Sequence, residues 1–171
     1  VAGTGTNAWN KIERNTCYNS KDNVMEVQSQ AFVRNNLMIN GIQGFSSQDD
    51  FDQEREIEVV HNTIINNRRG ANLDNWNNEP GLVFANNAVY SNTSQSVRFP
   101  VGWTGVYFNG NVVLGPVQVG QQNVLGPGFI DGTGLQDFVD VNWSGTKHDA
   151  TPSPGSPLIN GADPAQLLPD D

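Results

Sequence analysis

Few side chains in this sequence of 171 residues could do acid–base chemistry or hold a charged ligand. Asp and Glu number 18, Lys and Arg nine, and histidine two. No Gly-x-Ser-x-Gly segment and no Ser–His–Asp order indicates a nucleophilic serine. The single cysteine, Cys17, excludes an intramolecular disulfide framework and an all-cysteine metal site. The chemistry open to the chain is therefore that of carboxylates, arginines and amides.

Two carboxylates, Glu26 and Asp74, could act together in the hydrolysis of a glycosidic bond. Such hydrolysis needs a pair of carboxyl groups roughly 5–10 Å apart. If the two residues share one column of a stacked sheet and lie two coils apart, their backbones are roughly 10 Å apart, because coils repeat at about 4.8 Å. Their side chains could close that gap, so a glycoside hydrolase is one alternative.

An acidic segment follows residue 48. Clustered carboxylate oxygens are the ligands that Ca²⁺ prefers, although the spacing here does not match an EF-hand loop. A solvated run of charges is the other interpretation. The candidate calcium ligands are Asp49, Asp50 and Asp52.

Arg98 has the kind of side chain that pairs with the carboxylate of a uronic acid through two hydrogen bonds. The neighbouring Arg68 and Arg69 are expected in a surface turn, from which they could also contact an anionic glycan. His61 directly precedes one of the repeated asparagines described below, so we expect it to make structural hydrogen bonds. Arg98 is therefore the main candidate for contact with an acidic substrate.

Aromatic and amide side chains could bind a sugar beside these charges. Indole faces stack on the C–H surfaces of sugars, and amides bond their hydroxyls. The alternative is that the tryptophans only cover loops and that the amides belong to a solvated sheet face. The candidates are Trp76, Trp103, Gln28, Gln48 and Asn72.

The composition excludes several classes of partner. A formal net charge of −9 with only three lysines gives no basic footprint for nucleic acid or for an anionic membrane surface. No apolar run reaches the roughly 18–20 residues of a transmembrane helix, and the first residues show no charged and apolar regions of a signal peptide. We therefore expect neither nucleic acid nor a membrane as a partner.

Asparagine is in excess, at 23 residues, and much of the excess belongs to a repeated phrase. The phrase is an apolar residue, two variable residues, Asn, one variable residue, two mainly apolar residues, and then Asn, Ser or Gly. Its anchor asparagines are 21, 26, 25 and 24 residues apart, and a period of this size with short β-type segments indicates a solenoid. A leucine-rich repeat has a similar period, but its leucine consensus is absent. The anchors are Asn15, Asn36, Asn62, Asn87 and Asn111.

Each repeat divides into three short strands, two within the phrase and one outside it. In stacked coils each strand pairs with its copies above and below, and the anchor asparagines can bond one another as a ladder in successive bends. Asparagine also tolerates the left-handed backbone that such a bend requires. The third strands are expected at 24–28, 44–48, 71–75, 96–99 and 117–119.

Side chains of a strand alternate between its two faces. On the third strands the apolar residues would point inward, which leaves carboxylates, amides and Arg98 on the outer face. The variable loop after each third strand brings Trp76 and Trp103 to the same side. The outward row is Glu26 and Gln28, Ser46 and Gln48, Asn72 and Asp74, Arg98, and Gln118.

The Asn-x-apolar-apolar phrase resembles the repeat of right-handed parallel β-helix proteins of the pectate-lyase-like type. The tail, with 126–131 and 154–161, is similar to the segment that ends many secreted bacterial β-helix proteins. The resemblance implies an all-β, single-stranded, right-handed parallel β-helix of about five to seven coils, each of about 24 residues with three short strands. It also implies a secreted or cell-surface location in a bacterium, a sugar-binding groove on the outward row, and Ca²⁺ as a helper in lyase chemistry.

We expect one domain with two parts. Residues 1–120 form the coils, and residues 121–171 form the remnant of a last coil, a cap and a Gly- and Pro-rich tail. No capping element precedes the first repeat phrase, although solenoids need their end strands covered. The chain is therefore expected to be the C-terminal part of a longer protein, or to have its first coil covered by a partner chain. A short protein with its own cap is the alternative.

These observations predict a carbohydrate-active module that binds an acidic polysaccharide and cleaves it by β-elimination, with Arg98 as a candidate base. The net charge of −9 opposes an anionic glycan unless Ca²⁺ or a local basic patch compensates. Two alternatives stay open: a non-catalytic structural or adhesive surface module, and a glycoside hydrolase of the same fold. The sequence does not decide whether the module is an enzyme, and among enzymes it favours a lyase over a hydrolase.

Overall fold

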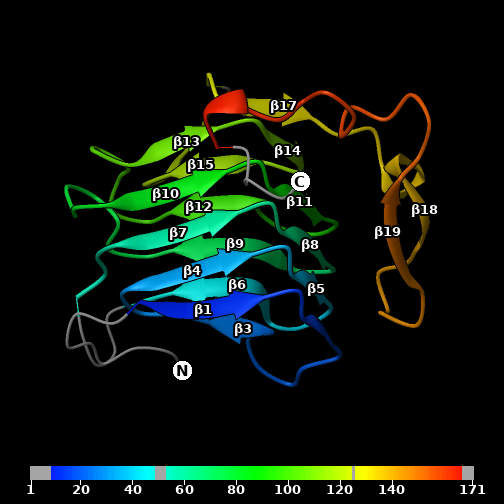
Figure 1. The fold of residues 1–171 in the computed structure, drawn as a ribbon, viewed down its shortest axis with the longest axis horizontal. Helices are drawn as coiled ribbons and strands as arrows, with labels where there is room; N and C mark the ends of the chain where they lie inside the picture. The colour runs from blue at the N-terminus through cyan, green and yellow to red at the C-terminus, as the bar shows by residue number, and fades with distance from the viewer. Residues whose placement is uncertain (1–8, 49–52, 125, 167–171) are drawn as a thin grey trace.

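Three sheets of short strands run along one solenoid in the computed structural model, which describes residues 9–48, 53–124 and 126–166 (Figure 1). Sheet A contains β1 (Asn10–Glu13), β4 (Ala31–Arg34), β7 (Ile57–Val60), β10 (Leu82–Ala85) and β13 (Tyr107–Asn109). Sheet B contains β2 (Thr16–Tyr18), β5 (Leu37–Ile39), β8 (Thr63–Asn66), β11 (Ala88–Ser91), β14 (Asn111–Leu114) and β17 (Phe129–Asp131). Sheet C contains β3 (Met25–Glu26), β6 (Gln43–Ser47), β9 (Arg69–Leu73), β12 (Val97–Phe99), β15 (Val117–Val119) and β16 (Gln122–Val124).

Each coil contributes one strand to each sheet, in the order A, B, C, and these strands pair in parallel with their copies in the next coil. The predicted all-β parallel solenoid is therefore confirmed. Sheet A holds five strands, so the chain makes about four turns from β1 to β13, slightly fewer than the expected five to seven coils. The difference arises after β15, because β16 turns back antiparallel to it and only β17 continues a sheet.

The residue before each ladder asparagine adopts a left-handed backbone. The φ angles are 54° at Asn35, 55° at His61 and 54° at Asn86. Asparagine is several-fold enriched at positive φ among residues other than glycine. The pairs 35–36 and 86–87 thus use one asparagine for the bend and the next for the ladder, which accounts for part of the asparagine excess.

The anchor asparagines stack in the bend between sheets A and B. Asn36 Nδ2 donates to Asn62 Oδ1 at 3.0 Å, and Asn62 Nδ2 donates to Asn87 Oδ1 at 3.1 Å. The same oxygens accept the backbone N–H of the asparagine one coil earlier. The ladder runs from Asn15, which is exposed in the first coil, to Asn111, and the four asparagines after Asn15 are buried.

An apolar core fills the coils. In sheet C its inward positions form one column by strand pairing, and every member after the first is buried. That column is Met25, Phe45, Ala71, Val97 and Val117. Alternation along these strands then turns the intervening polar side chains to the outer face of sheet C.

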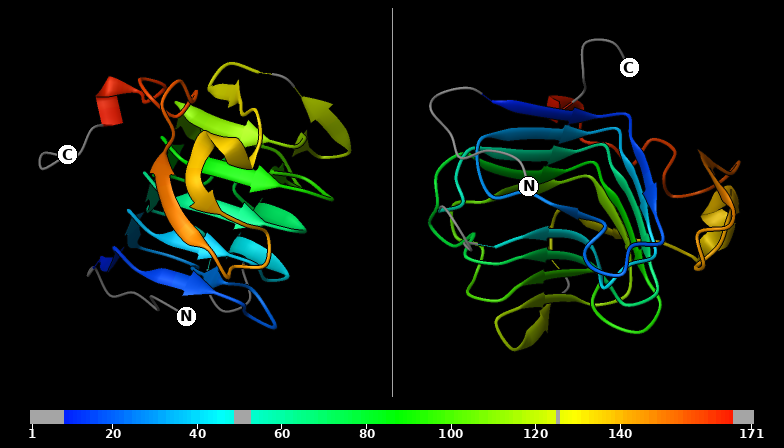
Figure 2. Two further views of the ribbon diagram at one scale, coloured as in Figure 1. Left: turned by 90° about the vertical axis from the view of Figure 1, so that its right-hand side faces the viewer. Right: turned by 90° about the horizontal axis from the view of Figure 1, so that it is seen from below.

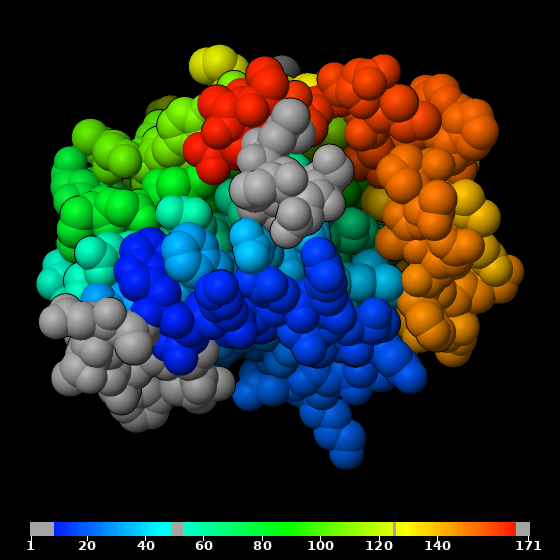
Figure 3. All heavy atoms as spheres, in the orientation of Figure 1, coloured from blue at the N-terminus to red at the C-terminus, as the bar shows by residue number. Residues whose placement is uncertain are grey.

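After β17 the chain leaves the coils and covers the outer face of sheet B. The hairpin of β18 (Phe138–Val141) and β19 (His148–Pro152) lies in front of the coils in the left view of Figure 2 and beside them in the right view, and Figure 3 shows it against the side of the solenoid. A second apolar cluster seals this contact. Its buried members are Ile39, Ile65, Ala88, Tyr90, Val112, Phe138 and Val141.

A buried carboxylate anchors the turn into the hairpin. Tyr90 Oη donates to Asp137 Oδ2, and the backbone N–H of Thr133 donates to the same oxygen at 2.7 Å. Burial alone would raise the pKa of Asp137, but hydrogen bonds from Thr133 and Tyr90 outweigh burial and hold that pKa below its usual value. Burial and the bond to Asp137 raise the pKa of Tyr90.

Helical structure in the described residues is limited to two 3₁₀ turns, η1 (Leu135–Asp137) and η2 (Pro164–Gln166). Neither of these turns, nor any other described segment, forms an apolar helix of the length needed to cross a membrane.

Candidate functional site

The outer face of sheet C carries a polar column along the solenoid. Strand pairing aligns Glu26 with Ser46, Ser46 with Asn72, Asn72 with Arg98, and Arg98 with Gln118. Each step is one coil, or about 4.8 Å. The column thus brings together three of the candidate residues: Glu26, Asn72 and Arg98.

The proposed carboxylate pair does not share that column. Glu26 aligns with Asn72, and Asp74 lies two residues further along the chain. Two coils of about 4.8 Å and two residues of about 3.3 Å put the two backbones roughly 12 Å apart. Glu26 Oε2 also accepts a hydrogen bond from Asn23 Nδ2 at 2.8 Å. The prediction that Glu26 and Asp74 share a column is therefore wrong. The strand pairing fixes the register of the sheet, and the sequence alone did not show that pairing.

Arg69 joins Arg98 at this face, although the sequence placed it in a turn. It is the first residue of β9, and its Nε and Nη1 lie 3.4 Å from Gln95 Oε1 and 3.5 Å from Gln43 Oε1. Burial lowers the pKa of Arg69, and repulsion from Arg98 and Arg68 lowers it further, against an opposing effect of Asp74. The pairing of Gln43 with Arg69 in the sheet shows that the strand begins two residues earlier than expected.

These three arginines, defined here as the arginine cluster (Arg68, Arg69 and Arg98), make no ion pair within the described ranges. Arg68 and Arg69 line a hollow of about 300 Å³ together with Thr93 and Ser94. Like charges held together without carboxylate partners repel one another. A bound anion would remove that cost.

Three buried polar atoms near the column also lack partners. Gln28 Nε2, Ser46 Oγ and Asn72 Oδ1 have no hydrogen-bond partner in the described part of the chain, and the three residues are 1%, 0% and 3% exposed. Buried polar atoms nearly always have a partner, and an ordered water or a ligand atom commonly supplies it. Ser46 was expected in the outward row but was not among the candidate ligands.

The two tryptophans lie elsewhere. Trp76 is fully buried in the core, where its Nε1 donates to Ser47 Oγ at 3.0 Å and its ring meets the edge of Phe99. Its indole therefore cannot stack on a sugar in this structure. Trp103 is partly buried at the end of the core, stacked on Phe108 with ring centroids 4.5 Å apart. Gln48 is half-buried at the end of β6.

The calcium candidates Asp49, Asp50 and Asp52 lie outside the described residues. Among the residues that are described, no group of three or more His, Cys, Asp or Glu side chains could hold a metal ion. The neighbouring Glu54 is fully buried.

No protein-family model, no curated protein and no solved structure matches this chain. The site must therefore be judged from its own chemistry. Along one face it offers guanidinium groups, which bond carboxylates and other oxyanions in pairs, and amides and a hydroxyl, which both donate and accept hydrogen bonds. This combination can hold an acidic, hydroxyl-rich ligand.

Proposed function

We propose that the outer face of sheet C binds an acidic polysaccharide. The observation that carries the proposal is the arginine cluster, whose three guanidinium groups stand together without ion-pair partners in the described residues. A chain with 18 acidic and nine basic residues has carboxylates enough to pair them. Leaving them unpaired at one place favours an anionic ligand over a purely structural role.

The shape of the face suits a polymer. Polar positions recur once per coil, at about 4.8 Å, from Glu26 to Gln118. A linear glycan lying along the solenoid axis would meet the half-buried side chains of Glu26, Arg98 and Gln118. The Oδ1 of Asn72 and the Oγ of Ser46 lie below this surface, because both atoms are buried, so direct contacts with a polymer come from the half-buried Arg98 and Gln118.

Binding is tested by calorimetric titration of polygalacturonate and alginate, with dextran as the uncharged comparison. Arg98→Ala and Arg69→Gln should each weaken binding of the acidic polymers about tenfold, because a hydrogen bond to a charged group contributes about 1.5–3 kcal/mol. Lys147→Ala removes the same charge from the hairpin, where the lysine is exposed and paired with Asp140, and should leave affinity unchanged in about 0.1 M NaCl, where distant charges are screened. Equal losses in all three variants would show a general charge effect and no site.

Cleavage by β-elimination is the second part of the proposal, and the position of Arg98 on the column, beside Arg69, favours it. The base would remove the C5 proton of a uronate, the electron pair would form the C4–C5 double bond, and the glycosidic oxygen would leave C4 and be protonated. Arg68 and Arg69 would hold the substrate carboxylate beside that carbon.

The unsaturated product absorbs in the ultraviolet, so turnover is measured directly, with Ca²⁺ and with a chelator. Arg98→Ala should abolish product formation, and Glu26→Gln, which the lyase does not need, should not. A glycoside hydrolase would show the reverse dependence on Glu26 and would release reducing ends without ultraviolet absorbance. Binding without any product would leave a non-catalytic, adhesive module.

A further inference from the structure

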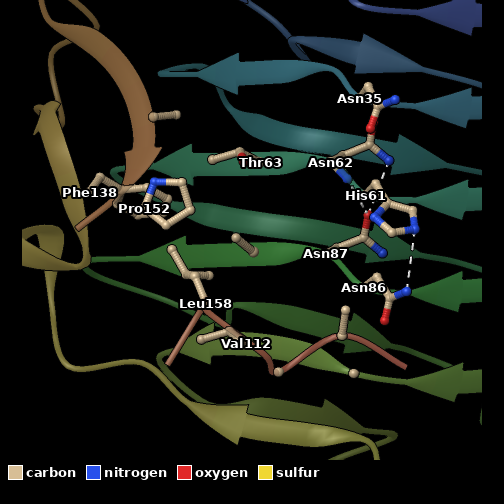
Figure 4. Close-up of a pocket in the computed structure, with 15 residues that line it drawn as sticks. Asn35, His61, Asn62, Thr63, Asn86, Asn87, Val112, Phe138, Pro152 and Leu158 are labelled. Carbon is tan, nitrogen blue, oxygen red and sulfur yellow. Dashed lines mark hydrogen bonds between the residues drawn. The ribbon is translucent and has the colours of Figure 1, made fainter. Parts of the chain in front are cut away.

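A second hollow lies on the other side of the molecule, between the asparagine bend and the C-terminal tail (Figure 4). Its volume is about 350 Å³, within the usual range for small-ligand sites. Residues from β8, β11 and β14 form one side, and residues from the hairpin and the segment after it form the other. Two parts of the chain that are far apart in sequence thus build one cavity.

This cavity is called here the bend pocket. Its solenoid side carries polar side chains that have no hydrogen-bond partner among the described residues. The amide of Asn35 and the hydroxyl of Thr63 line the pocket, and neither side chain has a hydrogen-bond partner in the described residues. Asn35 stands in the column of left-handed residues with His61 and Asn86, as Figure 4 shows. Thr63 pairs with Leu37 in sheet B, so it lies one coil along the solenoid and two residues along the strand from Asn35.

The opposite side is apolar and fixed in place. Phe138, Pro152 and Leu158 face the pocket from the tail. Two residues of the bend hold the chain that follows Leu158: His61 Nε2 donates to the carbonyl oxygen of Gln166 at 2.6 Å, and Asn86 bonds the backbone of Asp163 in both directions, at 2.6 and 3.1 Å. The tail wall is thereby tied to the solenoid.

No Lys, Arg, Asp or Glu lines the bend pocket among the described residues, in contrast to the arginine cluster. An anion or a cation would find no countercharge there. An amide and a hydroxyl can each donate to and accept from a sugar hydroxyl, while apolar side chains pack against the C–H face of the same ring.

We propose that the bend pocket binds a neutral pyranose unit, either a free monosaccharide or one residue of a glycan. Asn35 and Thr63 bond its hydroxyls, and Leu158, Pro152 and Phe138 cover its apolar face. This site is separate from sheet C and does not depend on the function proposed for that face.

Amide and methyl chemical shifts, recorded by NMR during titration with glucose, galactose, mannose and N-acetylglucosamine, test the proposal. At least one of these sugars should shift the signals of Asn35, Thr63 and Leu158 in a saturable way. Asn35→Gly, which keeps the positive φ, and Thr63→Val, which keeps the shape, should each weaken that sugar about fivefold, the effect of one lost hydrogen bond.

Asn78→Gly is the matched control, because Asn78 also has a positive φ but is exposed outside the pocket, and it should leave the affinity unchanged. Thermal unfolding of each variant shows that the fold is retained. The proposal is overturned if no neutral sugar shifts these signals, if glucuronate or galacturonate binds as tightly as the neutral sugars, or if the two pocket variants bind as well as Asn78→Gly. None of these results bears on binding of polymers to sheet C, which the Arg98 variant reports.

Discussion

Asn62, one of the ladder asparagines, joins the coils on both sides of it through its side chain. Asn62 accepts two hydrogen bonds from Asn36 through Oδ1, at 3.0 Å each, and its Nδ2 donates to Asn87 Oδ1 at 3.1 Å and to the carbonyl oxygen of Val33 at 2.8 Å. Its side chain is shielded from water. Removing it leaves buried donors and acceptors on both adjoining coils without partners.

We therefore expect Asn62→Ala to lower the free energy of unfolding by about 3 kcal/mol or more, because each buried polar group left unpaired costs about 1–3 kcal/mol. Asn15→Ala is the control, since Asn15 is the exposed end of the ladder and water can replace its bonds. It should cost less than about 1 kcal/mol. Urea titration measures both, and equal losses in the two variants would mean that the ladder contributes no more than an ordinary surface amide.

The anchor asparagines and Trp76 show what single residues reveal before the fold is known. The asparagines could be placed because five copies of one phrase fix both the coil and the position in it. Trp76 belongs to no repeated phrase and stands in a loop. Nothing around it in the sequence shows whether that loop extends into solvent or folds back onto the core. The structure turns it into the core because Ser47 offers its indole N–H a buried acceptor.

Among the elements, the β18–β19 hairpin depends on two ionisable groups for its attachment to sheet B. The pKa of Asp137 is lowered from its usual value of 3.8, so its contribution to stability is present above that pH and is lost as the pH falls through the lower folded value. The pKa of Tyr90 is raised above 10.0, so its contribution is present below that pH and declines as the pH rises beyond it.

Tyr90→Phe should therefore flatten the alkaline decline in the free energy of unfolding and make the protein less stable at neutral pH. It should also shrink the acid decline, because Asp137 loses one of its hydrogen bonds. Tyr18→Phe, at a tyrosine that is 50% exposed, should change neither limb. The measurement is urea unfolding over a series of pH values, and an unaltered alkaline limb in Tyr90→Phe would contradict the assignment to Tyr90.

Strand positions were easier to predict than strand register. The third strands fall within two residues of the expected ranges, because apolar alternation and the 24-residue spacing mark them. The alignment of Glu26 with Asn72 and not with Asp74 depends on coil lengths of 20 and 26 residues between pairing partners. The bend pocket had no sequence signal, because one wall comes from residues 35–112 and the other from residues 138–162, and the two meet only when the tail folds back.

At the scale of the whole molecule, the arginine cluster sits in a protein of net charge −9. An acidic polysaccharide is then repelled by the distant charges and attracted by the near ones. Salt separates these effects, because the screening length falls from about 30 Å at 0.01 M to about 10 Å at 0.1 M. The long-range repulsion is screened first, and contacts between guanidinium and carboxylate groups are screened later.

Affinity for polygalacturonate should therefore pass through a maximum as NaCl rises from about 0.01 to 0.5 M, with a chelator present so that Ca²⁺ plays no part. Arg98→Ala should lower the curve and flatten its falling limb, because fewer close ion pairs remain to be screened. Lys147→Ala leaves the close contacts intact and makes the net charge more negative, so it should steepen the rising limb alone. An affinity that only rises with salt, in the unaltered protein as in Arg98→Ala, would mean that no local cluster holds the polyanion, and sheet C would lose its role as the binding face.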